Sequence, residues 1–115
     1  MQWTRLTNPD QLQELIDISR NTPCLIFKHS TRCGISEIAQ HRLKDHWPWD
    51  ESQIRTFHVD VIESRAISDA IAQRFGIAHE SPQVLLIREG RCIYHDSHLD
   101  ISVGNLEEVL ASAAQ

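Results

Sequence analysis

The sequence predicts an α/β fold in which a four-stranded mixed sheet is flanked by helices. Three observations predict it. Segments with apolar residues at helical spacing alternate along the chain with short segments of strand length. Two successive strand–helix–strand connections favour parallel pairing of the first strands. The last two strands are joined by Glu89-Gly90, a two-residue hairpin signal, which makes the closing pair antiparallel.

The first predicted helix begins at a clear start signal. Asn8 is a suitable N-cap, Pro9 fits the first helical position, and Gln11 can complete a capping box. The helix is expected to end near Asn21. Its apolar face is formed by Leu12, Leu15, Ile16 and Ser19.

The first predicted strand, residues 24–28, is a continuous apolar run, as is typical of a central strand covered on both faces. A polar turn over residues 29–32 follows it. A second helix is then expected from about Cys33 to His46, and it ends at Trp47-Pro48 because proline cannot continue a helix. The predicted inner face of this helix comprises Ile35, Ile38, Ala39 and Leu43.

The second half of the chain repeats the alternation. Apolar and polar residues alternate over residues 54–61, which predicts a strand. A third helix is expected over residues 64–75, and it ends at Gly76, a good C′ residue. Strands are expected over 83–88 and 91–95, and a last helix near 105–113. The resulting order, αβαβαββα, is the element order of a thioredoxin fold, and its length suits one domain over residues 1–115.

Composition excludes several function classes. The chain carries 11 basic and 16 acidic residues, a net charge of −5, and no basic stripe, so nucleic acid is not expected as a partner. No apolar run approaches the roughly 18 residues of a membrane-spanning helix. The amino terminus has no apolar signal-peptide core, and the expected location is therefore the cytoplasm.

The most informative residue is Cys33, because it opens a helix directly after a buried strand and a polar turn. Free N–H groups and the helix dipole favour an anion at that position, and the thiolate is the reactive form of cysteine. Arg32 precedes it, and Ser36 lies one turn later, where its hydroxyl can donate to the sulfur. Ser36 replaces the second cysteine of a dithiol enzyme, so the pattern C-x-x-S predicts a monothiol site. His29 is either a residue that tunes the thiolate or an ordinary surface histidine.

The other two cysteines are not expected to form a disulfide with Cys33. Cys24 begins the first strand, and five or six strand residues at about 3.3 Å each separate it from Cys33. Cys92 follows the closing hairpin, at the far end of the sheet. Both are interpreted as small buried apolar residues. The seven histidines are scattered without metal-ligand spacing, and no metal site is expected.

The dipeptide Ser81-Pro82 directly before a strand is either an ordinary turn or a cis-proline. A thioredoxin arrangement places a cis-proline here, beside the reactive cysteine. In that case the backbone of Ser81 is free to pair with an extended substrate.

Residues 27–36, with the sequence FKHSTRCGIS, closely resemble the signature of the monothiol bacilliredoxins. Residues 79–83 and 94–98 are also similar to that family. The resemblance implies a thioredoxin-like fold, a cytoplasmic protein, and removal of bacillithiol from mixed disulfides on other proteins. It implies no tightly bound cofactor, bacillithiol as the thiol co-substrate, and S-thiolated proteins and a disulfide reductase as partners.

The resemblance also implies roles for individual residues. Cys33 is the catalytic nucleophile, and Arg32, Ser36, His29 and Thr31 stabilise its thiolate or shape the approach to it. Ser81 and Pro82 position the substrate.

Two alternatives remain open at this point. Gly34 departs from the proline of many relatives, which makes Cys33-Gly34-Ile35-Ser36 similar to the CGFS site of monothiol glutaredoxins. Those proteins can share an iron–sulfur cluster between two chains, with a small thiol as a further ligand. The third hypothesis is a thioredoxin-like interaction module without catalysis.

Overall fold

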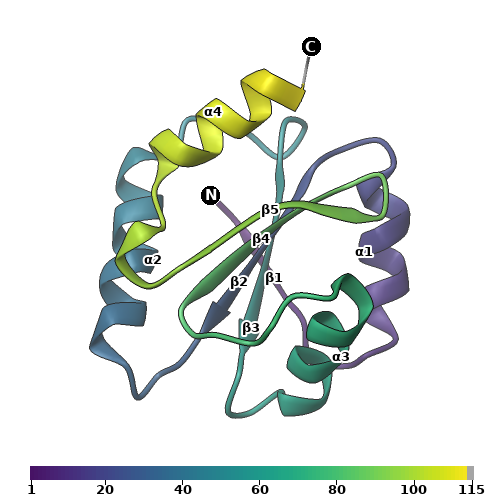
Figure 1. Cartoon of the computed structure of the whole chain (residues 1–115), viewed down its shortest axis with the longest axis vertical. Helices are drawn as coiled ribbons and strands as arrows, with labels where there is room; N and C mark the ends of the chain where they lie inside the picture. The colour runs from purple at the N-terminus through teal and green to yellow at the C-terminus, as the bar shows by residue number, and fades with distance from the viewer. Residues whose placement is uncertain (114–115) are drawn as a thin grey trace.

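A five-stranded mixed sheet forms the centre of the molecule, in the order β1-β3-β2-β4-β5 (Figure 1). The structure is a computed structural model, and it describes residues 1–113. β3 is parallel to both β1 and β2, whereas β4 is antiparallel to β2 and to β5. The strands are β1 (Trp3–Arg5), β2 (Cys24–His29), β3 (Arg55–Asp60), β4 (Gln83–Arg88) and β5 (Arg91–Ser97).

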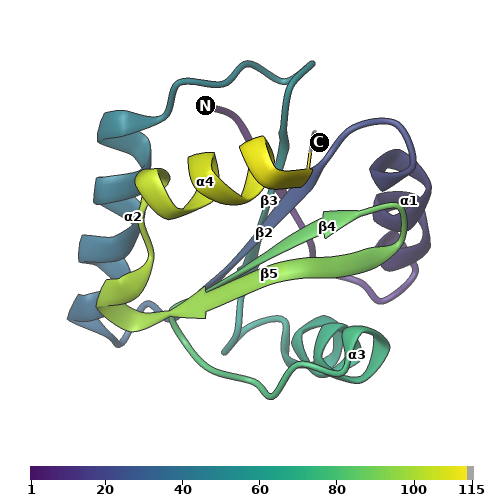
Figure 2. The ribbon, with the colours of Figure 1, turned by 45° about the horizontal axis from the view of Figure 1, so that its top comes forward.

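Helices cover both faces of the sheet (Figure 2). They are α1 (Gln11–Ser19), α2 (Gly34–His46), α3 (Arg65–Phe75) and α4 (Val103–Ala113), with a short 3-10 turn, η1 (His98–Asp100), before α4. α1 and α3 pack on the face that carries Ile26 and Leu85. α2 and α4 pack on the opposite face, which carries Phe27 and Leu86. Because both faces are covered, β2 and β4 are continuous apolar runs.

The predicted fold class is confirmed, but the sheet has five strands rather than four. The missed strand, β1, has only three residues, and it pairs with β3 at the edge of the sheet. Two of those residues are exposed, so the segment lacks the apolar pattern that indicates a strand. Residues 3–5 therefore form a strand because they pair with β3, and their local sequence alone does not indicate one.

Four boundaries differ from the prediction by two residues each. α1 begins at Gln11 rather than Pro9, and it ends at Ser19 rather than near Asn21. The side-chain oxygen of Gln11 accepts the backbone N–H of Asn8 at 3.0 Å, which is one half of the predicted capping box. β5 extends to Ser97, and α4 begins at Val103, two residues before the predicted start.

The predicted inner face of α2 is wrong for two of its four residues. Ile35 and Ile38 are 40% and 52% exposed. The buried positions of the helix are Ser36, Ala39 and Leu43. This spacing of three and four residues keeps the buried side chains on one face, which lies against the sheet. Ile35 and Ile38 share a neighbouring face, which is turned to solvent.

The predicted hairpin turn at Glu89-Gly90 and the predicted helix end at Gly76 both have the backbone conformation expected of them. Glu89 and Gly90 have φ values of 53° and 76°, as a two-residue hairpin requires. Gly76 ends α3 with a φ of 68°, in the left-handed conformation that glycine adopts without a steric penalty.

Candidate functional site

Cys33 lies where β2 ends and α2 begins, as the N-cap residue of α2. Its backbone is extended, with φ −120° and ψ 113°, and its carbonyl accepts the N–H groups of Ser36 and Glu37 at 3.1 and 3.4 Å. Its own N–H donates to the Ser30 carbonyl at 3.2 Å. The side chain is half-buried, and its sulfur forms no disulfide. The structure thus places a partly accessible thiol at the N-terminus of a thirteen-residue helix, where an anion is favoured.

Ser36 is positioned differently from the sequence prediction, in which its hydroxyl donates to the Cys33 sulfur. The side chain is fully buried, and Oγ lies 2.7 Å from Nδ1 of His29 and 3.1 Å from the backbone nitrogen of Ser30. Within residues 1–113, no hydrogen bond joins Ser36 to the Cys33 sulfur. Ser36 therefore ties the turn before Cys33 to the first turn of α2.

His29 is neutral in this arrangement. Burial lowers its pKa, and the nearby carboxylates of Asp60 and Glu37 offset only part of that effect. Because Ser36 Oγ accepts the Ser30 N–H, its own proton is free to go to the unprotonated Nδ1 of His29. His29 thus orients the turn through Ser36, and no hydrogen bond within the described residues links it to the sulfur.

A second histidine, His58, packs beside His29, with ring centroids 5.3 Å apart. Its ring also stacks on Phe27 at 6.0 Å. Burial lowers the pKa of His58 to about 4, and the neighbouring His29 and Arg5 add to this shift. Both rings are therefore uncharged at neutral pH, and the sequence did not identify His58 as part of the site.

Thr31 and Arg32 are exposed on the turn that leads to Cys33. Arg32 forms no ion pair in the part of the chain that the structure describes, so its guanidinium is available to a ligand. It lines a pocket together with Arg65, Ser68, Asp69 and His79. The turn before Cys33 thus forms one wall of a pocket whose other wall comes from α3.

The peptide bond between Ser81 and Pro82 is cis, which agrees with the thioredoxin arrangement rather than an ordinary turn. Pro82 is buried, and its carbonyl accepts the backbone N–H of His98 at 3.0 Å. The hydroxyl of Ser81 is buried without a hydrogen-bond partner among the described residues. This segment leads directly into β4, whose first residue pairs with Lys28 near the end of β2.

Cys24 and Cys92 lie away from this site, as expected. Cys24 pairs with Ile87 near the hairpin end of the sheet, and its side chain is fully buried. Burial raises its pKa to about 12. Burial also raises the pKa of Cys92, whose sulfur contacts the Tyr94 carbonyl at 3.3 Å. Neither cysteine is placed to react with a mixed disulfide on Cys33.

Lys28 is a buried charged residue beside the site that the sequence analysis did not single out. It lies in β2 and is fully buried, and its Nζ donates to the Ser68 carbonyl at 3.0 Å and to Nδ1 of His79 at 3.3 Å. Burial lowers its pKa to about 8, and the carboxylate of Asp69 partly offsets the effect. A signal was present, because a lysine at the end of an apolar central strand is unusual.

The family comparison identifies which of the two resembled families the chain matches. The family described as monothiol bacilliredoxin BrxC matches residues 4–106. The chain belongs to the monothiol bacilliredoxin family. The match includes the turn with Cys33, the buried Lys28 and the cis-proline segment, so one family pattern covers all the features described above.

Solved structures agree with this assignment. A protein described as an oxidoreductase with a thioredoxin fold is 27% identical to this bacilliredoxin, with a TM-score of 0.79 over 92% of this chain and 91% of that chain. Thioredoxin from Malassezia sympodialis is 14% identical, with a TM-score of 0.74 over 99% and 92% of the two chains. Mitochondrial thioredoxin 3 from Saccharomyces cerevisiae is 21% identical, with a TM-score of 0.69 over 96% and 94%. The last two show the fold alone.

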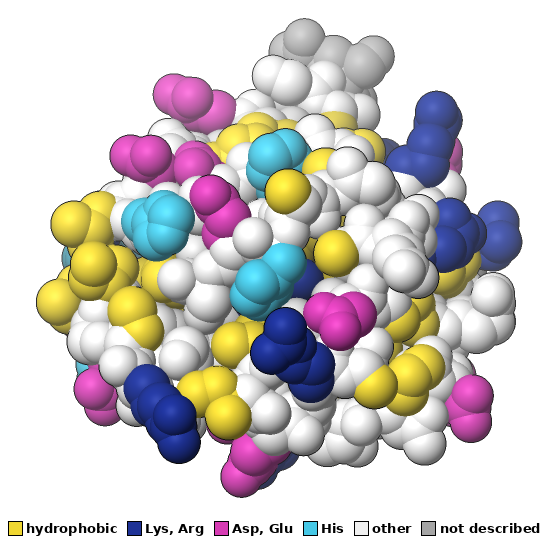
Figure 3. Space-filling model, turned by 60° about the horizontal axis from the view of Figure 1, so that its bottom comes forward, with side chains coloured by type: hydrophobic (Ala, Val, Ile, Leu, Met, Phe, Trp, Pro, Cys, Tyr) yellow, Lys and Arg dark blue, Asp and Glu magenta, His cyan; other side chains and the backbone are white. Residues whose placement is uncertain are grey.

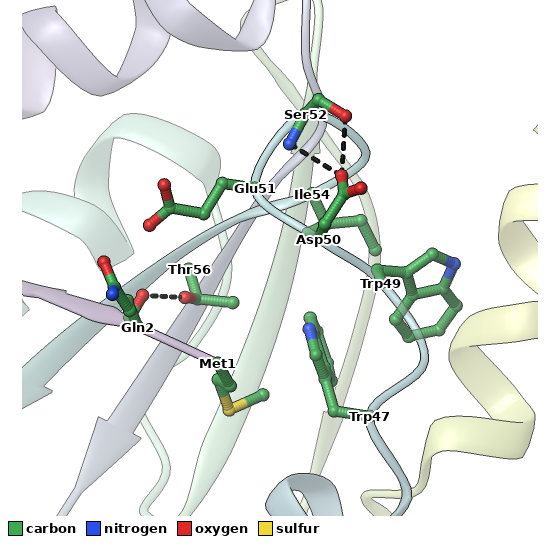
Figure 4. Close-up of a pocket in the computed structure, with 9 residues that line it drawn as sticks. All are labelled: Met1, Gln2, Trp47, Trp49, Asp50, Glu51, Ser52, Ile54 and Thr56. Atoms are coloured by element: carbon green, nitrogen blue, oxygen red, sulfur yellow. Dashed lines mark hydrogen bonds between the residues drawn. The ribbon is translucent and has the colours of Figure 1, made fainter.

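The bacilliredoxin also has a pocket at the opposite end of the sheet (Figure 4). The rings of Trp47 and Trp49 meet edge to face there, with centroids 4.8 Å apart. Ile54, directly before β3, also lines it. Because β2 and β3 are parallel, the start of β3 and the end of β2 lie at opposite ends of the sheet. This pocket is therefore separate from Cys33.

Among residues 1–113, no three His, Cys, Asp or Glu side chains come together as a metal site. No helix of the described chain is long and apolar enough to cross a membrane.

We predict that Ser36→Ala destabilises this protein by about 1–3 kcal/mol, because it removes the buried hydroxyl that is the partner of the half-buried Ser30 N–H and His29 Nδ1. Chemical unfolding followed by circular dichroism measures the change. Ser112→Ala, at an exposed position of α4, is the matched control and is expected to change stability by less than about 0.5 kcal/mol. An equal effect of the two substitutions would contradict the role of Ser36.

Proposed function

We propose that this protein removes bacillithiol from protein mixed disulfides by thiol–disulfide exchange through Cys33. Membership of the monothiol bacilliredoxin family and the structural likeness to an oxidoreductase support a thiol redox role. The observation that carries the proposal is Cys33 itself, a half-buried N-cap thiol followed by Ser36 where a dithiol enzyme has its second cysteine.

The proposed reaction has two exchange steps. The Cys33 thiolate attacks the bacillithiol sulfur of the modified protein. A disulfide forms between Cys33 and bacillithiol, and the target cysteine leaves as a thiolate that takes a proton from water. A second thiolate, from free bacillithiol or a disulfide reductase, then attacks the bacillithiol sulfur of the mixed disulfide. A disulfide forms between this second thiol and bacillithiol, and Cys33 leaves as a thiolate. That second thiol supplies the electrons for the overall reduction.

Several residues support the first step. The free N–H groups at the start of α2 and the guanidinium of Arg32 favour a sulfur anion at Cys33. Ser36 and His29 act as positioning residues that hold the turn. The exposed Thr31 borders the approach, and the backbone of Ser81, positioned by the cis bond to Pro82, pairs with an extended substrate. Because the reaction depends on reduced small thiols, we place the protein in the cytoplasm.

The decisive experiment uses a peptide with one cysteine that carries bacillithiol in a mixed disulfide. The wild-type protein is expected to release the peptide thiol and to acquire bacillithiol at Cys33, both followed by mass spectrometry. Cys33→Ser is expected to release it only at the rate observed without protein, whereas Cys92→Ser retains the wild-type rate. Release by Cys33→Ser at the wild-type rate would rule out the proposal. The same peptide carrying glutathione tests the identity of the thiol.

A further inference from the structure

A cluster of cationic side chains surrounds the pocket between the turn before Cys33 and helix α3. Arg32 and Arg65 line the pocket, and the ammonium of Lys28 contacts two other lining residues, Ser68 and His79. The lining contains one carboxylate, Asp69, which lies 3.9 Å from Arg65 in an exposed pair of small energetic value. The pocket is thus cationic, although the chain as a whole has a net charge of −5.

Lys28 is the unusual member of this cluster. No carboxylate lies within ion-pair distance of its buried ammonium in the described part of the chain. The ammonium has three N–H donors, and only the Ser68 carbonyl and His79 are recorded as partners. A buried charge without a counter-ion is costly, and an anion nearby removes part of that cost.

The contact with Lys28 also determines which ring nitrogen of His79 can donate a hydrogen bond. An ammonium group can only donate, so Nδ1 of His79 is the acceptor in the 3.3 Å contact. The proton of the neutral ring is then on Nε2, on the opposite side of the ring from Lys28. His79 lines the pocket together with Arg32 and Arg65, and its Nε2–H is the donor left for a ligand. Two guanidinium groups and an imidazole therefore line one pocket, and a buried positive charge lies against the imidazole.

Figure 3 shows the end of the molecule at which β2 ends, with histidine, basic and acidic side chains next to one another in its centre. The pocket neighbours the reactive thiol along the chain, because its lining residue Arg32 directly precedes Cys33, and its lining residue His79 lies three residues before the cis-proline. Its cationic lining suits a carboxylate on a small molecule that is held by its sulfur.

We propose that this pocket, formed by Arg32, Arg65 and His79 over the buried Lys28, binds a carboxylate of the small thiol that Cys33 exchanges. This inference rests on the proposed function and adds the chemical class of the thiol, an anionic thiol whose carboxylate lies away from its sulfur. Arg32 and Arg65 bind the carboxylate by hydrogen bonds and charge. Lys28 is a positioning residue that orients His79 and adds charge from below.

The first experiment does not depend on exchange chemistry. Succinate is titrated into the Cys33→Ser protein, and binding is followed by NMR at the side chains of His79 and the arginines. Saturable shifts at His79 and Arg65 are expected, and they are expected to disappear in Arg65→Gln and in Lys28→Met. Arg74→Gln, at the far end of α3, is the control. Shifts that are absent, or that are equal in all variants, would overturn the inference.

The second experiment tests the connection to Cys33. Equilibrium constants for mixed-disulfide formation are measured with bacillithiol, with bacillithiol whose carboxylates are methyl esters, and with 2-mercaptoethanol. The wild type is expected to favour the free carboxylates over the esters by about tenfold, which is the effect of one charge-assisted hydrogen bond. Arg65→Gln and Lys28→Met are expected to lose this preference, whereas the control Arg74→Gln is expected to keep it. The equilibrium constant with 2-mercaptoethanol, which has no carboxylate, is the reference against which each variant's preference is calculated.

The second experiment distinguishes a failure of the carboxylate pocket from a failure of the proposed function. Exchange with all three thiols at equal strength would overturn the carboxylate pocket and leave the proposed function intact. No exchange at Cys33 with any thiol would overturn the proposed function.

Discussion

An alkylating reagent at neutral pH is expected to modify Cys33 rapidly and to leave the buried Cys24 essentially unmodified while the protein is folded. Cys24 is fully buried, and its pKa is raised to about 12. At pH 7 a thiol of that pKa is ionised in only about one molecule in 10⁵. Cys24 is therefore expected to react at least about a thousand times more slowly than Cys33, at a rate set by opening of the fold.

Cys92 is expected to react at an intermediate rate. Its side chain is half-buried, whereas that of Cys24 is fully buried, and burial raises the pKa of Cys92. Peptide mapping by mass spectrometry after timed exposure to iodoacetamide gives the three rates separately. In denaturant the three cysteines are expected to react alike, which is the control. Equal rates for Cys24 and Cys33 in the folded protein would contradict the assignment of Cys33 as the reactive thiol.

Lys28→Met is expected to stabilise the protein at pH 7 by about 1–3 kcal/mol. The pKa of Lys28 is lowered from 10.5 to about 8, a difference that corresponds to roughly 3 kcal/mol for keeping the buried amine charged. Loss of the hydrogen bonds to Ser68 and His79 offsets part of this gain. Methionine has a similar length and no charge, so it fills the same space without that cost.

The pH dependence of this difference is the more specific result. Between pH 8 and 10.5 Lys28 is protonated in the unfolded chain and neutral in the fold, so the free energy of unfolding of the wild type rises with pH. The advantage of Lys28→Met is therefore full at or below pH 7, declines above pH 8, and is lost by about pH 10.5. Urea unfolding of both proteins across this range measures it.

Lys44→Met is the matched control, because Lys44 is exposed on α2. It is expected to change stability by less than about 0.5 kcal/mol at each pH. A Lys28→Met protein that is less stable than the wild type at pH 7 would show that the buried amine stabilises the fold. The expected result would instead indicate that Lys28 is present for ligand binding, although its buried charge lowers the stability of the fold.

Much of the fold could be predicted because the signals are local. β2 and β4 are predicted within one residue, since each is an uninterrupted apolar run between polar turns. The start of α2 and the end of α3 follow from a polar turn and from Gly76. β1 could not be predicted, because three mostly exposed residues carry no pattern of their own. Ile35 and Ile38 were placed in the core because they are apolar, but the neighbouring Ser36 is buried instead.

The position of the reactive thiol follows from local sequence. A buried strand, a polar turn and a helix start are all encoded within about ten residues of Cys33, so no distant contact is needed to place it. The side chains around that thiol, in contrast, come from distant parts of the chain. Lys28 meets Ser68 and His79 across 40 and 51 residues of chain, and His29 takes the Ser36 hydroxyl that the sequence had assigned to the sulfur. Hydrogen bonds of that kind depend on how helices pack on the sheet, which local patterns do not specify.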